Sequence, residues 1–304
     1  MSTIQKVAIV GGNGALGAPV LKALLAAGFE VTALSRAAGK VAAQPHLTEV
    51  VIDFADHAAL VSALKGLDAV VSTTGNQSGD VQIALVNAAV EAGIKRFIPS
   101  DFGSDLQHPE IRSLPVFAEK IKVQELLIQK SKETSLTYTF INNNAFLDWG
   151  LEHKFILDPV DRKATLWDGG EHLVTLTSLA TVGQGVVGVL KHPEETKNRV
   201  VYIQEVAVSL KKLVGIVQEA APGHTWAVTV GDSKEAATKA IEALSNHVYE
   251  PWVFLHQIFR AAAGKGGWAH FEKNDNKLLG VKELDDEELK KAVKETLQKI
   301  PGAI

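Results

Sequence analysis

Residues 6–36 read KVAIVGGNGALGAPVLKALLAAGFEVTALSR and place four glycines within seven positions, directly after an apolar and partly β-branched run. The run Lys6–Val10 has a strand pattern, Ala15–Ala27 has a helical period, and Glu30–Leu34 has a second strand pattern. A strand, a glycine-rich turn, a helix and another strand in this order predict a βαβ unit with two parallel strands.

The same alternation continues to about residue 150. Strand patterns follow at Thr48–Ile52, Ala69–Thr73, Arg96–Pro99 and Thr137–Ile141, and helix-period segments lie at His57–Leu64, Val81–Ala92 and Val116–Lys130. Nearly continuous apolar strands are typical of strands that are buried on both faces. We therefore expect an α/β fold, a Rossmann-type doubly wound parallel sheet with helices on both faces.

The pattern changes after residue 150. Polar loops precede helical patterns at Ser178–Leu190, Ser209–Ala220, Ser233–Ala243, Glu250–Ala263 and Asp285–Ile300. One strand pattern, Arg199–Gln204, stands alone among them and is a candidate to return to the main sheet. We predict a Rossmann domain over residues 1–150, with the strand near 199–204 as a candidate addition, and a smaller mixed α+β domain over residues 151–304.

Composition excludes several classes of function. The 304 residues carry 31 basic and 35 acidic side chains in scattered positions, so we expect no nucleic-acid and no membrane partner. The chain has no cysteine, which excludes disulfides, thiolate metal sites and cysteine nucleophiles. Its histidines show no metal-ligand spacing, so we predict no metal site. The N-terminus enters a strand pattern without a signal-peptide layout, and we expect a cytoplasmic protein.

The glycine turn Gly11–Gly17 predicts a dinucleotide site. A pyrophosphate needs backbone N–H groups at a helix N-terminus, approached more closely than a β-carbon allows. In GGNGALG, Gly11 would permit the tight turn, Gly14 the approach to phosphate and Gly17 the packing of helix on strand. Gly12, Asn13, Ala15 and Leu16 complete the predicted cradle. The alternative is a tight structural turn that binds nothing.

The end of the second strand indicates which dinucleotide binds. An NAD site usually has an acidic residue there, which accepts hydrogen bonds from the ribose hydroxyls. This chain has Ser35-Arg36 instead, with Lys40 nearby. A carboxylate repels a 2′-phosphate, whereas a guanidinium binds one in bidentate fashion. We therefore predict NADP(H); the alternative is that Arg36 and Lys40 are solvated loop cations.

Polar and aromatic residues at the ends of the next strands are further candidates for the cofactor site. Asp53 and Phe54 follow the third strand, at the expected place of the adenine, and Ser72, Thr73 and Thr74 end the fourth. Ligands of open α/β sheets bind at this carboxyl edge. The alternative for both groups is ordinary turn chemistry.

Lys120 is the candidate proton donor. The chain has three tyrosines and none is followed by lysine four residues later, so the usual Tyr-x-x-x-Lys pair of short-chain dehydrogenases is absent. On a helical projection of Val116–Lys130, at about 100° per residue, Lys120 falls inside the apolar arc. Its amine either extends out to solvent or points into a cleft, where desolvation would lower its pKa.

Four segments carry a resemblance to a known family: GGNGALG, RFIPSDFGSD from Arg96, PVFAEKIKVQELL from Pro115 and LTYTFINNNAFLDW from Leu136. They resemble the isoflavone reductases, also called phenylcoumaran benzylic ether and pinoresinol–lariciresinol reductases, an NmrA-like branch of atypical short-chain dehydrogenases. The similarity is strong to about Trp149 and weak after it, and the tail resembles fungal members. Two segments of this chain, LQHPEIRSLP and VQELL, differ from the corresponding segments of the plant members. The resemblance therefore does not imply that this chain acts on the substrates of the plant enzymes.

The resemblance implies a Rossmann domain, a smaller substrate domain and NADPH dependence. Phe117-Ala-Glu-Lys120 matches the family's Phe-x-x-Lys pattern, which implies that Lys120 is the catalytic acid/base and that it also lies against the cofactor. Asn144 and Phe146 match its Asn-x-Phe motif, and Asn143 is expected beside them at the cofactor; three asparagines in a row are also typical of a turn. Ser100 and Phe102 lie in a motif that implies a loop beside the nicotinamide.

We expect an NADPH-dependent reductase of a small aromatic or conjugated substrate, active as a monomer or homodimer. The nicotinamide would deliver a hydride, and Lys120 would act at the attached oxygen. Aromatic residues that line the cleft or else fill the core are Trp149, Phe155, Trp167 and Phe254. Two alternatives remain: a non-catalytic NmrA-like NADP(H) sensor, and a reductase with His153 or Tyr138 as the proton donor.

Overall fold

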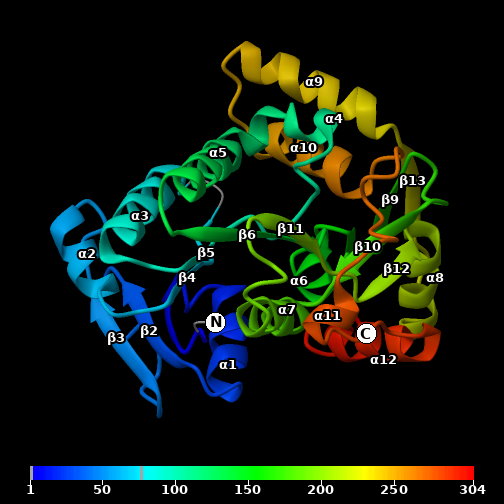
Figure 1. Ribbon diagram of the computed structural model, residues 1–304. Coiled ribbons are helices and arrows are strands. Elements are labelled where there is room, and N and C mark those ends of the chain that lie inside the picture. The colour runs from blue at the N-terminus through cyan, green and yellow to red at the C-terminus, as the bar shows by residue number, and fades with distance from the viewer. Residues whose placement is uncertain (1–2, 76–77) are drawn as a thin grey trace.

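A computed structural model describes residues 3–75 and 78–304 of the chain (Figure 1). The first 150 residues alternate strands and helices. The strands are β1 (Lys6–Val10), β2 (Glu30–Ser35), β3 (Leu47–Val51), β4 (Ala69–Ser72), β5 (Arg96–Ile98), β6 (Thr137–Asn142) and β7 (Ala145–Phe146). The helices are α1 (Gly17–Ala26), α2 (His57–Leu64), α3 (Gly79–Ala92), α4 (Pro109–Arg112), α5 (Ala118–Glu133) and α6 (Leu147–Glu152), with a 3₁₀ turn at Pro115–Phe117.

The main sheet has seven strands in the order β11-β6-β5-β4-β1-β2-β3, and every pair in it is parallel. Its edge strand β11 (Arg199–Tyr202) comes from the second half of the chain and pairs with β6. The predicted Rossmann-type arrangement is confirmed. The order reverses between β1 and β4, and an open α/β sheet binds ligands at such a point.

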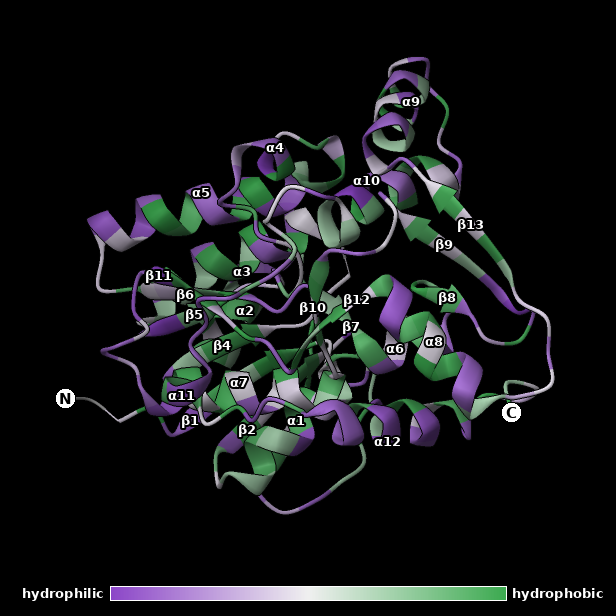
Figure 2. Cartoon of the chain, turned by 90° about the vertical axis from the view of Figure 1, so that its right-hand side faces the viewer, coloured by the Kyte–Doolittle hydropathy of each residue, from purple (hydrophilic) through white to green (hydrophobic). Residues whose placement is uncertain are grey.

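Both faces of the sheet are covered because successive side chains of a strand point to opposite faces. Val7 and Ile9 of β1 belong to a core that includes α1 and α7 (Leu179–Lys191). Ala8 and Val10 belong to a second core, formed with α2, α3 and α5. In Figure 2 the central strands are largely green and the purple, hydrophilic segments lie on the outside.

The second half of the chain forms two small sheets and further helices around a third core. The sheets have the orders β12-β10-β7 and β13-β9-β8. The strands are β8 (Leu157–Asp158), β9 (Lys163–Trp167), β10 (Leu173–Thr177), β12 (Val206–Ser209) and β13 (Ala227–Gly231). The helices are α8 (Leu210–Ala220), α9 (Ser233–Ser245), α10 (Pro251–Ala263), α11 (Asn276–Leu279) and α12 (Asp286–Leu297).

The structure corrects several predicted elements. Residues between His153 and His172 were expected as polar loops, but they contain β8 and β9. The predicted helix over Val116–Lys130 starts as a 3₁₀ turn, and its α-helical part runs from Ala118 to Glu133. Ser178 and Ser209 are not helical residues but N-caps, whose hydroxyls accept backbone N–H groups of the first turn. None of the helices within residues 3–75 and 78–304 combines the length and apolar character that spanning a bilayer requires.

Candidate functional site

The glycine turn between β1 and α1 leaves no room for a β-carbon at Gly11 or Gly17. Gly11 has φ +82°, and a β-carbon on it would lie 2.8 Å from the carbonyl oxygen of Thr73. A β-carbon on Gly17 would lie 1.9 Å from the carbonyl oxygen of Gly11. The Gly14 N–H donates to that same oxygen at 2.9 Å, which closes the turn. Gly11 is therefore required by the close approach of the turn to Thr73 at the end of β4, and Gly17 by the close approach of α1 to the turn.

A cavity of about 410 Å³ opens over this turn at the carboxyl ends of the strands. Of the predicted cofactor residues, those that line it are Gly11, Gly12, Asn13, Gly14, Arg36, Lys40, Phe54, Thr73 and Thr74. Arg36 and Lys40 are both exposed, so their charges are free to meet a ligand from solvent. The structure thus brings the glycine turn, the basic pair and the two threonines to one concave surface.

Other predicted cofactor residues lie behind this surface. Ala15 and Leu16 lead into α1, and Leu16 packs against the core of that face. The Asp53 carboxylate accepts the N–H of Ala55, which is turn chemistry. Ser72 is buried and does not line the cavity, and its hydroxyl forms a hydrogen bond with the Thr74 hydroxyl.

Glu49 is a residue that the sequence did not single out. It lies on β3 opposite Ala33 of β2, and it accepts backbone N–H groups from Gly39 (2.7 Å) and Lys40 (2.9 Å). The hydrogen bond from Gly39 is the largest of the effects that hold the pKa of Glu49 below its ordinary value. Its carboxylate fixes the loop that carries the basic pair and does not line the cavity.

Ser100 connects the nucleotide cavity to a second pocket. Its hydroxyl donates to the Thr74 carbonyl at 2.6 Å, and its N–H donates to Oε1 of Gln82 at 2.7 Å. The next residue in the chain, Asp101, lines a pocket of about 200 Å³. Both pockets therefore lie along the same stretch of sheet edge, one on each side of Ser100.

Lys120 lines this second pocket. Its side chain is half-buried, and its Nζ donates to the backbone carbonyl of Asp101 at 2.5 Å. Burial lowers the pKa of Lys120, and the negative charge of Asp101 opposes that effect. The helical projection predicted an inward position for this lysine, and the amine is held at the pocket and not extended into solvent.

The Asp101 carboxyl group is buried and points to a different partner. Its Oδ2 accepts Nε2 of Gln124, one turn along α5 from Lys120, at 2.7 Å. Burial raises the pKa of Asp101 to about 6, and the nearby charge of Lys120 limits that rise. Asp101 lies within the RFIPSDFGSD segment, but nothing in the sequence pattern implied a role for it at the site. Only the fold brings it against α5.

The rest of this pocket is almost entirely apolar. Of the predicted residues, those that line it with Lys120 are Phe102, Asn144, Phe146, Trp149 and Phe155. Asn144 has φ +53°, and its Nδ2 lies within hydrogen-bond distance of the carbonyls of Thr175, Ala262 and Ala269. Asn144 thus ties three segments together at the pocket wall.

Several candidates lie elsewhere. Asn143 is buried and lines neither cavity, and its Nδ2 donates to the Asn144 carbonyl. Tyr138 stacks on Phe140 in the core of the sheet, and His153 stacks on Trp149 outside the pocket lining. Neither alternative proton donor reaches the second pocket. Phe254 does not line it either.

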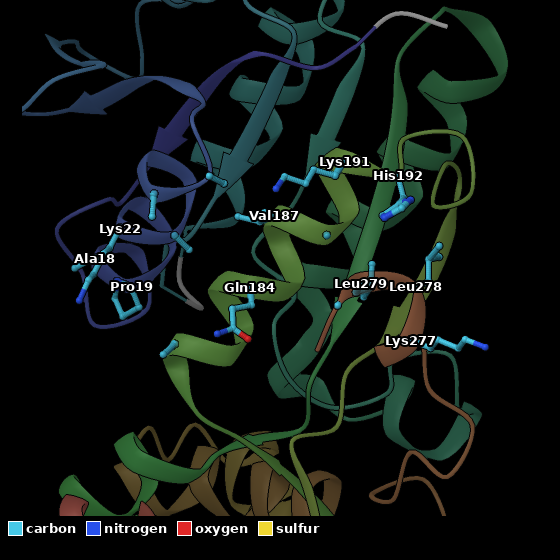
Figure 3. Close-up of a pocket in the computed structure, with 16 residues that line it drawn as sticks. Ala18, Pro19, Lys22, Gln184, Val187, Lys191, His192, Lys277, Leu278 and Leu279 are labelled. Atoms are coloured by element: carbon cyan, nitrogen blue, oxygen red, sulfur yellow. The ribbon is translucent and has the colours of Figure 1, made fainter. Parts of the chain in front are cut away.

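A larger cavity, of about 1050 Å³, lies between α1, α7 and α11 (Figure 3). Lys22 of α1, Lys191 of α7 and Lys277 of α11 contribute to its lining, and no acidic residue of the described chain does. None of the predicted site residues lines this cavity, so it is separate from the candidate site. Among the residues that the structure describes, no group of three or more His, Asp or Glu side chains is arranged to hold a metal ion.

The chain is similar to known proteins in both sequence and fold. A family model described as the NmrA-like family matches residues 3–250. The oxidoreductase aprR of Aspergillus flavus is 32% identical over 281 residues, which cover 91% of this chain and 94% of that protein. The crystal structure of an isoflavone reductase has a TM-score of 0.73 at 22% identity and covers 98% of this chain and 100% of its own. The complex of AtPrR2 with NADP+ and (+)pinoresinol has a TM-score of 0.70 at 22% identity, with 97% and 100% covered.

Proposed function

The chain belongs to the NmrA-like family, and on this premise we propose that it is an NADPH-dependent oxidoreductase that reduces an aromatic or conjugated small molecule of isoflavonoid or phenylpropanoid type. The nucleotide-binding part comprises residues 1–150 together with β11, which completes its sheet. Residues 151–304 form the substrate-binding domain, which contributes Phe155, Leu255, Ile258 and Ala262 to the substrate pocket, and residues 101–149 supply the rest of its lining. The monomeric or homodimeric state and the cytoplasmic location remain predictions of the sequence.

NADP(H) would bind in the cavity over the glycine turn. The N–H groups of Gly12 and Asn13 and the N-terminus of α1 would hold the pyrophosphate, while the Gly14 N–H stays bonded to the Gly11 carbonyl and keeps the turn closed. Arg36 and Lys40 bind the 2′-phosphate, since both line the cavity and are exposed. The Glu49 carboxylate lies close to this loop, but its oxygens are engaged by Ser35, Gly39 and Lys40. Its role is to order the loop.

The observation that carries the proposal is the position of Lys120. The Lys120 side chain is half-buried at a mostly apolar pocket, which Ser100 and Thr74 connect to the cavity over the glycine turn. Low polarity favours the neutral amine, so the pKa of Lys120 moves toward the range where a proton is transferred readily. The hydrogen bond from Nζ of Lys120 to the Asp101 carbonyl orients the amine in the absence of substrate.

In the reaction, the bound cofactor supplies a hydride to a substrate carbon made electrophilic by conjugation. Lys120 donates a proton to the substrate oxygen that becomes negatively charged when the conjugated system accepts the hydride, directly or through a water. Phe102, Phe146 and Trp149 exclude water around the reacting atoms and offer flat faces to an aromatic ring. Among the described residues that line this pocket, Lys120 is the cationic one, so the oxygen of the substrate is expected to lie beside it.

The test follows NADPH oxidation with a panel of isoflavonoid, quinone-methide-forming and enone substrates. Lys120→Ala is expected to lower kcat by about 10²- to 10⁴-fold, the range of general acid catalysis, and to leave NADPH binding nearly unchanged. The matched control is Lys122→Ala, because Lys122 lies on the same helix but is exposed and paired with Glu119. Full activity of Lys120→Ala would refute the mechanism. If the protein binds NADPH but turns over none of these substrates, the alternative function, a non-catalytic NmrA-like NADP(H) sensor, would be favoured.

A further inference from the structure

A small second cavity lies behind the proposed substrate pocket. It measures about 20 Å³, against about 200 Å³ for the pocket in front. Three residues line both spaces, namely Ala145, Phe155 and Ala262. These residues therefore form the wall that separates the two.

The rear cavity has a uniformly apolar lining. Trp167 and Phe259 form one side of it, and Val174, Leu176 and Leu210 contribute aliphatic side chains. A space of this size holds at most one water, and no charged, hydroxyl or amide side chain among the described residues lines it to bond with such a water. Such a space is better filled by an apolar group than by solvent.

Phe155 is the one large side chain in the dividing wall. Ala145 and Ala262 present only methyl groups, which cannot move aside. The Phe155 ring is half-buried and lies between two aromatic neighbours, with centroids 4.8 Å from Phe259 and 6.2 Å from Trp149. It follows directly on Lys154, an exposed residue with φ +58° in the turn after α6. A rotation of this ring would join the two spaces without disturbing a strand or helix.

We propose that the space behind Phe155 is a cryptic apolar subsite, which receives an aryl or alkyl substituent on the side of the substrate remote from Lys120. Phe155 closes the subsite when the substrate lacks that substituent and turns aside when it is present. The inference rests on the proposed function only in taking the front pocket as the substrate site. Phe155 thus sets the length of substrate that the protein accepts.

The test compares two probes by calorimetric titration in the presence of NADP+: 4-phenyl-3-buten-2-one and its para-propyl derivative. In Phe155→Ala the subsite is permanently open, so affinity for the propyl probe is expected to rise about tenfold or more relative to the parent probe, since each buried methylene strengthens binding about fourfold. Phe155→Leu, which keeps an apolar side chain, is expected to shift the ratio in the same direction and covers the case that the alanine variant fails to fold.

The matched control fills the rear cavity without touching the front pocket. Ala263 lines the rear cavity but not the front pocket. Adding Ala263→Val to Phe155→Ala is therefore expected to cancel the gain in affinity for the propyl probe and to leave the affinity for the parent probe unchanged. The proposal would be overturned if Phe155→Ala left the ratio of the two affinities unchanged or did not bind the propyl probe at all. It would also be overturned if the gain in affinity for the propyl probe persisted after Ala263→Val was added. The measurement needs no turnover, so failure of both probes to oxidise NADPH would count against the reductase function alone.

Discussion

Lys120 donates its hydrogen bond to the backbone carbonyl of Asp101 at 2.5 Å, while the Asp101 carboxylate turns away to Nε2 of Gln124 at 2.7 Å. The lysine is therefore aimed by a neutral group and influenced by the carboxylate only through its charge. A direct ion pair would hold the proton on the amine more firmly. The observed arrangement keeps the amine oriented and still able to give up its proton.

Asp101→Asn tests this relationship through the pH dependence of kcat/KM. The negative charge of Asp101 raises the pKa of Lys120, against the larger effect of burial. Removing that charge must lower the pKa of Lys120 further. Since the protonated amine is the active form, the rate falls as pH rises through this pKa, and the variant is expected to lose activity at lower pH than the wild type.

Asp101→Glu is the control for that measurement, because it keeps the charge and leaves the alkaline limb near its wild-type position. An Asp101→Asn profile that superimposes on the wild-type profile would show that the carboxylate has no influence on the proton donor.

The pH dependence of the free energy of unfolding tests the burial of the Asp101 carboxyl group independently of activity. Burial raises its pKa from 3.8 to about 6, so between these values the folded chain holds a proton that the unfolded chain has released. The contribution of this group to the free energy of unfolding therefore falls as pH rises through that window and is constant above it. Relative to wild type, Asp101→Asn is expected to gain stability between about pH 4 and about pH 7 in urea unfolding. A difference independent of pH would mean that the carboxyl is solvated.

Local pattern was sufficient for most of the fold but not for the contacts of the site. Apolar runs and helical period predicted six strands of the main sheet and the inward face of Lys120. They missed β13, whose side chains are mostly exposed and whose apolar residues Val228 and Val230 face solvent. Glu49 was missed because its link to Lys40 depends on the register of β3 against β2. The hydrogen bond between Asp101 and Gln124 joins the loop after β5 to α5. It depends on how α5 packs against the sheet, which no spacing in the sequence reveals.

Arg36→Ala is expected to separate the two dinucleotides. Loss of a hydrogen-bonded charge pair to phosphate costs about 1.5–3 kcal/mol, which corresponds to a weakening of NADPH binding by about 10- to 100-fold. NADH lacks the 2′-phosphate, so its affinity should change little. Fluorescence titration of both dinucleotides measures the effect. Lys22→Ala is the control, since Lys22 is an exposed lysine that lines the separate cavity beside α1. Equal loss for both dinucleotides would remove Arg36 from the phosphate site.

The close approach of α1 to the end of β1 is tested with a pair of glycine substitutions. Gly17→Ala places a methyl 1.9 Å from the Gly11 carbonyl oxygen, so α1 must shift and the cradle over the glycine turn must open. We expect loss of NADPH binding together with a lower melting temperature. Gly215→Ala, within α8, meets no atom within 4 Å and has no positive φ, so it should stabilise the protein by about 0.5–1 kcal/mol through helix propensity. Both variants are measured by thermal unfolding and by titration with NADPH. A Gly17→Ala protein that binds NADPH as the wild type does would show that the turn has room to spare and that its glycines do not serve the dinucleotide.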